Sequence, residues 1–152
     1  QSGTQVRLEL ITADPAFNAI TASFAVIDDP GERALLGNQN LHVHLTWLID
    51  STDPMYDPLK VLWRATFKLV DTGSTGYTES IPFTFYFASV ACTRGDCNAD
   101  TVVNSADIQA FTDILLNPAS KTASQRCSAD LDKDGYVTMN DVAPFVNALL
   151  AI

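Results

Sequence analysis

Oxygen-bearing side chains recur at fixed intervals in two short stretches near the C-terminal end of the sequence. The stretches span residues 96–107 and 130–141, so the pattern repeats after 34 residues. In both, Asp, Asn or Thr occupies positions 1, 3, 5, 9 and 12. Such alternating oxygens, together with the backbone carbonyl of position 7, provide the six to eight hard ligands that Ca²⁺ requires. The spacing therefore predicts two calcium-binding loops.

Each loop offers the same number of candidate ligands. They are Asp96, Asn98, Asp100, the Val102 carbonyl, Asn104 and Asp107 in the first loop, and Asp130, Asp132, Asp134, the Tyr136 carbonyl, Thr138 and Asp141 in the second. The first loop contains three carboxylates and the second contains four. Position 6, which favours a positive φ, is Thr101 in the first loop and Gly135 in the second. We therefore expect the first site to bind calcium more weakly.

Apolar residues after each loop repeat with the same offset. The pairs are Ile108 and Val142, Phe111 and Phe145, Leu115 and Leu149, and Leu116 and Leu150. Their spacing places them on one helical face. We predict helices over residues 105–116 and 139–151, with room for a short helix in the connector at residues 119–126.

A calcium loop of the EF-hand kind followed by a helix, used twice with Asp at position 12, resembles the type I dockerin family. The resemblance covers the segment from about Gly95 to Ile152. It implies two bound Ca²⁺ ions and docking to a cohesin partner. In that family, residues around positions 10 and 11 of each loop help to bind the partner. They correspond here to Ser105 and Ala106, and to Met139 and Asn140.

Residues before Cys92 show the two-residue period of half-buried strands. Five strands are predicted, at residues 5–12, 18–28, 41–49, 59–70 and 77–91. Residues 31–40 are predicted to be a loop. The pattern favours an antiparallel β-sandwich, immunoglobulin-like in the broad sense, although five strands are fewer than the usual seven. We therefore expect an α+β protein with a β-sandwich domain at residues 1–91 and a helical calcium module at residues 92–152.

Three cysteines flank or lie within the two loops: Cys92, Cys97 and Cys127. If the two repeats pack face to face, Cys97 and Cys127 come close, so we predict a disulfide between them, with Cys92–Cys127 as the main alternative. A disulfide is typical of an oxidising compartment. The chain begins without Met, as expected for a processed mature chain or an excised fragment, and removal of a secretory leader would explain this start. These features predict a secreted protein, which could be held at the cell surface.

The remaining features exclude several classes of function. The formal net charge is −9 and no basic patch exists, so nucleic acid is not an expected partner. No apolar run is long enough to span a bilayer. His42 and His44 share a strand face, but two ligands alone make no metal site. Trp47 and Trp63 are predicted to lie in the core rather than on a sugar-binding platform. No nucleophile motif is present, so we expect no enzymatic activity.

The leading hypothesis is an extracellular, calcium-binding structural or assembly protein that makes protein–protein contacts. It would either dock to a cohesin-like partner or assemble with copies of itself into a cell-surface fibre. In the fibre, residues 5–12 of one copy would complete the sheet of the next. The alternative is a carbohydrate-binding module or small glycan-active domain carried by a dockerin. A third possibility is a plain structural role, in which calcium stiffens a terminal stalk.

Overall fold

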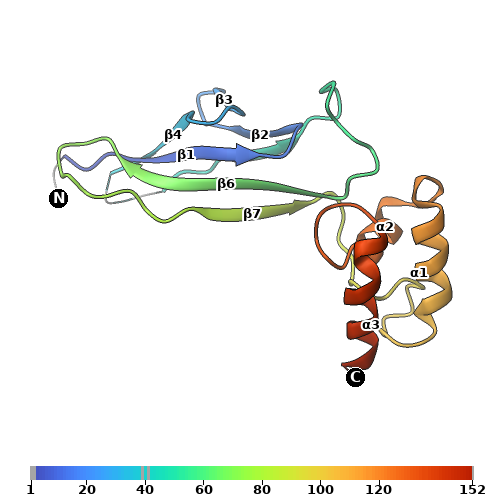
Figure 1. Cartoon of the computed structure of the whole chain (residues 1–152). Helices are drawn as coiled ribbons and strands as arrows, with labels where there is room; N and C mark the ends of the chain where they lie inside the picture. Colours follow the sequence, from blue (N-terminus) through green and yellow to red (C-terminus); the bar gives the residue numbers. More distant parts are fainter. Residues whose placement is uncertain (1–2, 39, 41, 152) are drawn as a thin grey trace. The chain divides into compact units, whose positions relative to one another are not determined.

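The protein is described by a computed structural model that covers residues 3–38, 40 and 42–151. It divides into two compact units. The first comprises Gln1–Tyr56 and Trp63–Tyr86, and the second comprises Asp57–Leu62 and Phe87–Ile152. Antiparallel sheets come first and helices follow, which confirms the α+β class (Figure 1). A boundary at residue 91 alone does not describe these units, because residues 57–62 and 87–91 group with the helices.

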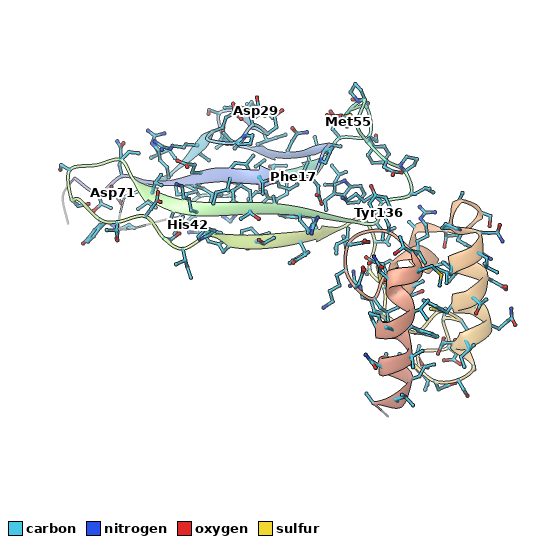
Figure 2. The ribbon with its side chains drawn as sticks, in the orientation of Figure 1. Phe17, Asp29, His42, Met55, Asp71 and Tyr136 are labelled. Atoms are coloured by element: carbon cyan, nitrogen blue, oxygen red, sulfur yellow. A yellow bond between two sulfur atoms is a disulfide. The ribbon has the colours of Figure 1, made fainter. Side chains whose placement is uncertain are left out.

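Seven strands form in the described residues before Cys92. They are β1 (Val6–Ala13), β2 (Phe17–Ile20), β3 (Val26–Ile27), β4 (Arg33–Gly37), β5 (Thr46–Ile49), β6 (Leu62–Asp71) and β7 (Phe83–Ala88). One sheet has the order β4-β1-β6-β7 and the other has the order β3-β2-β5. Aromatic side chains from both sheets meet between them, with Phe17 of β2 (labelled in Figure 2) and Trp47 of β5 against Phe67 of β6. Phe67 is fully buried, and its ring centroid lies 5.7 Å from that of Trp47.

Three of the predicted strands are markedly shorter than expected, and one strand was not predicted. The strand expected at residues 77–91 is β7, which covers only Phe83–Ala88. The strand expected at residues 18–28 is interrupted by a turn, where Phe24 has a φ of 61° and Thr21 accepts the backbone N–H of Ala25. The strand expected at residues 41–49 is β5, which begins at Thr46; Leu41 lies outside the described residues. The unpredicted strand is β4, which forms within residues 31–40 because β1 pairs with it from Val6 to Glu9.

The N-terminal strand lies inside its sheet. β1 pairs with β4 on one side and with β6 on the other. In an immunoglobulin constant domain the first strand lies at a sheet edge, so the immunoglobulin-like assignment is not confirmed. Donating residues 5–12 to another copy would require breaking both ladders, and the structure gives no support to that hypothesis.

The second unit contains three α-helices in its described residues. They are α1 (Asp107–Leu116), α2 (Ala123–Ala129) and α3 (Val142–Leu150), with short 3₁₀ turns at Pro118–Ser120 and Met139–Asp141. The rings of Phe111 and Phe145 stack with centroids 4.0 Å apart, so equivalent residues of the two repeats form the centre of the core. The short connector helix is α2, which begins at a capping box made by Thr122 and Gln125.

A charged cluster on β1 generates a prediction about acid stability. Glu9 lies opposite Arg33 on β4 and Lys68 on β6, with ion-pair distances of 2.5 and 3.1 Å. The hydrogen bond from Arg33 has the largest effect on Glu9 and lowers its pKa, and the hydrogen bond from Lys68 lowers this pKa further. Its contribution to stability should therefore be complete above the unfolded-state pKa of about 4.3 and should be lost as the pH falls through the lower, folded-state pKa.

We expect Glu9→Gln to lower the urea midpoint of unfolding of the first unit at pH 7 and to reduce the further loss of stability below pH of about 4. Glu79→Gln is the control, because Glu79 is exposed and contacts Lys68 alone in this cluster. If both variants show the wild-type pH dependence, the Glu9 ion pairs do not contribute to stability.

Candidate calcium-binding loops

The aspartate at position 12 closes each loop in the same way. Asp107 Oδ1 accepts the backbone N–H groups of positions 2 and 3, at 2.7 and 3.0 Å, and Oδ2 accepts that of position 9 at 2.9 Å. Asp141 makes the three equivalent bonds at 2.7, 3.0 and 2.8 Å. Both aspartates are fully buried. The two predicted loops therefore have a common internal structure, and each ends at the start of a helix.

Side chains at positions 3, 5 and 9 also hold the loop backbone. In the first loop, Asn98 accepts the N–H of position 5, Asp100 that of position 7, and Asn104 that of position 11. The second loop repeats all three contacts. Such Asx-type turns direct alternate side chains of the loop inward, which is the arrangement that an oxygen-coordinated cation requires.

Backbone conformation supports the loop assignment and distinguishes the two loops. Positions 4 and 6 have positive φ in both. At position 6, Thr101 has a φ of 74° and Gly135 a φ of 96°. A side chain in this region costs about 1–2 kcal/mol, whereas glycine adopts it freely. The first loop is therefore strained where the second is not.

The second loop has the stronger electrostatic requirement for a cation. The carboxylates of Asp130, Asp132 and Asp134 each offer an oxygen, and these oxygens lie within 4.8 Å of one another. Asp130 is fully buried, and its Oδ1 has no hydrogen-bond partner. Burial raises the pKa of Asp130, which the nearby guanidinium of Arg94 opposes. A buried carboxylate oxygen without a partner is unfavourable unless a cation compensates it. The donor set therefore fits Ca²⁺, which would neutralise this charge.

The first loop satisfies more of its own oxygens. Asp96 accepts the backbone N–H groups of Asp100 and Thr101, both at 3.0 Å. The amide of Asn98 donates to Asp100 at 2.9 Å. This loop has one carboxylate fewer, so its shape depends less on a bound cation, in line with the weaker site predicted from the sequence.

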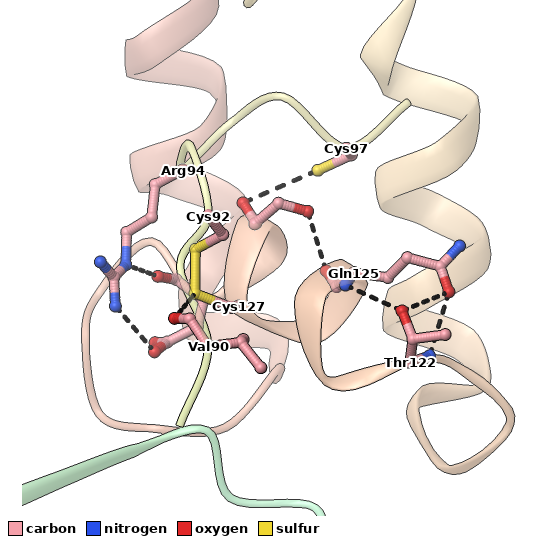
Figure 3. Close-up of a disulfide and its surroundings, with 9 residues drawn as sticks. Val90, Cys92, Arg94, Cys97, Thr122, Gln125 and Cys127 are labelled. Carbon is pink, nitrogen blue, oxygen red and sulfur yellow. Dashed lines mark hydrogen bonds and ion pairs between the residues drawn. A yellow bond between two sulfur atoms is a disulfide. The ribbon is translucent and has the colours of Figure 1, made fainter. Parts of the chain in front are cut away.

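The disulfide predicted from the sequence is wrong, and the alternative pairing is present. Cys92 is bonded to Cys127, with their Cα atoms 5.9 Å apart (Figure 3). Cys97 is a free thiol that is buried in the core cluster of the second unit. Its equivalent in the other repeat is Leu131, which also packs on this core, so the repeat itself marks position 2 as a core position. Burial raises the pKa of Cys97 to about 11, which keeps the thiol protonated and unreactive at neutral pH.

Other residues singled out in the sequence lie on the surface. The four expected partner-binding residues, Ser105, Ala106, Met139 and Asn140, are all exposed. His42 and His44 are exposed and contact each other edge to face. Trp63 is buried as predicted, but Trp47 is 37% exposed.

Calcium titration provides a direct check of the two loops. We expect calorimetry to show two Ca²⁺ ions per chain, with the tighter site in the second loop. Asp130→Ala should weaken its site by about tenfold or more, because it removes a buried carboxylate, and Asp96→Ala should have a smaller effect on its own site. One bound ion or none would contradict the paired-loop assignment, and the reverse order of the variants would contradict the ranking.

Reduction should destabilise the second unit. The Cys92–Cys127 bond closes a loop of 35 residues, which corresponds to about 3–4 kcal/mol of stability in the chain-entropy account. We expect Cys92→Ser to lower the unfolding midpoint as much as full reduction does. Peptide mapping without reduction should join Cys92 to Cys127 and leave Cys97 unmodified. A Cys97–Cys127 peptide would instead restore the pairing expected from the sequence.

Comparison with known proteins identifies the segment that carries both loops. The family model described as the dockerin type I domain matches residues 94–150. Comparisons with curated proteins and with solved structures found no match. The matched segment contains both loops and α1, α2 and α3, and the family is one of calcium-binding modules that dock to cohesins. Residues 94–150 are therefore a dockerin type I domain.

Proposed function

We propose that this protein is an extracellular docking protein, whose dockerin domain binds two Ca²⁺ ions and attaches the β-rich first unit to a cohesin-like partner. The observation that carries the proposal is a pair of equivalent, solvent-exposed helical faces in the two repeats. Each begins at position 10 of a calcium loop, so the loop that would hold the ion also sets the start of the face.

Residues with the spacing i, i+3, i+7 and i+11 make up each face. They are Ser105, Ile108, Thr112 and Leu116 in the first repeat, and Met139, Val142, Val146 and Leu150 in the second. Most apolar members of the two faces are exposed, with Leu116 at 70% and Leu150 at 77%, whereas Val142 is partly buried against the core. Apolar side chains left exposed at helical spacing are typical of a surface that another protein covers.

The second face is the more apolar of the two. Met139 and Val146 are 74% and 45% exposed, and they stand where the first face has Ser105 and Thr112. Because burial of apolar area drives association, the second face should contribute more to affinity for a partner. The two faces are related by the repeat but are not interchangeable.

The disulfide supports an extracellular location, since such bonds persist in oxidising compartments. Among the described helices, none is long and apolar enough to cross a membrane. We also propose a non-catalytic role. Among the described residues, Asp130, Asp132 and Asp134 form a group that could hold a metal ion, and we assign this group to calcium binding in the second loop.

A matched pair of substitutions tests the docking proposal. Val146→Asp places a charge on the second face, and Thr112→Asp places one at the equivalent position of the first. In millimolar Ca²⁺ with a panel of cohesin domains, we expect Val146→Asp to weaken binding by about tenfold or more, and Thr112→Asp to have a smaller effect. Chelation should abolish binding by the wild type. Failure of the wild type to bind any cohesin, or binding that survives chelation, would argue against calcium-dependent docking.

A further inference from the structure

Five residues of the connection between β5 and β6, together with the first residue of β6, belong to the calcium-binding unit. Asp57–Leu62 groups with Phe87–Ile152 rather than with β5 and the rest of β6. The dockerin match begins at residue 94, so this segment lies outside it. The unit that contains the loops is therefore larger than the matched domain.

A buried arginine holds the segment in place. Arg126 of α2 is 8% exposed, and its guanidinium donates to the backbone carbonyls of Pro58 at 2.8 Å and Leu59 at 3.2 Å. The same group donates to the carbonyls of Lys121 and Pro118, at 2.5 and 3.4 Å. Its fixed fork of donors thus joins the segment to the connector between α1 and α2.

The segment contacts the second loop at positions 6 and 7. The N–H of Val61 donates to the carbonyl of Gly135 at 2.9 Å. The ammonium of Lys60 lies over the ring of Tyr136 (labelled in Figure 2), 5.2 Å from its centroid. A Cβ atom at Gly135 would lie 2.4 Å from the carbonyl oxygen of Leu62, so glycine is also required there for close packing.

These contacts act on the backbone that supplies a candidate ligand. Because a peptide unit is planar, the hydrogen bond to the Gly135 carbonyl fixes the orientation of the bond that joins residue 135 to Tyr136. The next carbonyl, that of Tyr136, is the position-7 ligand. In the first loop the equivalent residues, Thr101 and Val102, are both exposed.

We propose that residues 58–61 support calcium binding in the second loop by holding its backbone at positions 6 and 7. Arg126 is the positioning residue that keeps residues 58–61 against the loop, and we call this arrangement the clamp. The proposal rests on the calcium binding assigned to the loops above. The segment holds positions 6 and 7 in place before an ion binds, so the loop loses less conformational entropy on binding. The calcium affinity of the second loop is therefore raised, whereas that of the first loop is not. Binding in the second loop should in turn stabilise the Val61 hydrogen bond.

Substitution of Arg126 in the full-length chain tests the clamp. We expect Arg126→Gln to weaken calcium binding at the second loop by about tenfold or more, which is the usual effect of removing an outer contact, and to leave the first loop unchanged. Arg126→Lys keeps the charge and some donors, so it should recover part of the affinity. Unchanged affinity at the second loop in Arg126→Gln, or equal weakening of both loops, would overturn the proposal.

Amide hydrogen exchange supplies a readout that does not depend on an Arg126 variant. Asp100→Ala and Asp134→Ala remove the position-5 ligand from the first and second loops respectively. With Ca²⁺ added, exchange at Val61 should slow in Asp100→Ala but not in Asp134→Ala. If Ca²⁺ slows exchange at Val61 equally in both variants, protection of the segment does not depend on the second loop. That result would refute the coupling between residues 58–61 and the second loop.

The wild-type titration separates this inference from the proposed function. If the second loop of the wild type binds no Ca²⁺, the calcium assignment and this inference both fail. If two ions bind and the second loop is insensitive to Arg126→Gln, only the clamp is refuted.

Discussion

The burial of three carboxylates, those of Asp107, Asp130 and Asp141, is the constraint on which the second unit depends. A carboxylate removed from water must be hydrogen-bonded or paired with a cation. Asp107 and Asp141 meet this requirement by accepting N–H groups of their own loops, which draws each loop closed onto the start of a helix. Asp130 meets it only in part, because one of its oxygens has no partner. Loop shape, helix start and the need for a cation thus follow from the same physical requirement.

The parts that the sequence predicts well are those that local spacing determines. A calcium loop is twelve consecutive residues, so the positions of its oxygens can be read directly. The stacked pair Phe111 and Phe145 follows from the same repeat. Strands are less local. β4 was not predicted because its pairing with β1, rather than its own residues Arg33–Gly37, stabilises it. The expected strand at residues 18–28 failed at Phe24, whose left-handed conformation the periodicity does not reveal.

Contacts between segments distant in sequence explain the remaining differences. The choice between Cys92 and Cys97 as the partner of Cys127 depends on which side chain points into the core. The correspondence of Cys97 with Leu131 carries that information, and reading the repeat at position 2 would have favoured the correct pairing. The segment at residues 57–62 offers no comparable signal. Its main contacts with Arg126 and Gly135 use backbone atoms, and backbone atoms leave no pattern in a sequence.

The two repeats share the same loop and helix conformation but differ in the features that favour calcium binding. The second loop combines four carboxylates, an unstrained glycine at position 6 and backbone support from Val61, whereas the first has three carboxylates and a strained Thr101. The second repeat also carries the more apolar face. That face begins with Met139 at position 10, two residues before the closing Asp141, so an ion in the second loop would order the residues from which the face starts. If the proposed function holds, the features that favour calcium binding and those that favour partner binding lie in the same half of the domain, and docking would depend chiefly on the ion in the second loop.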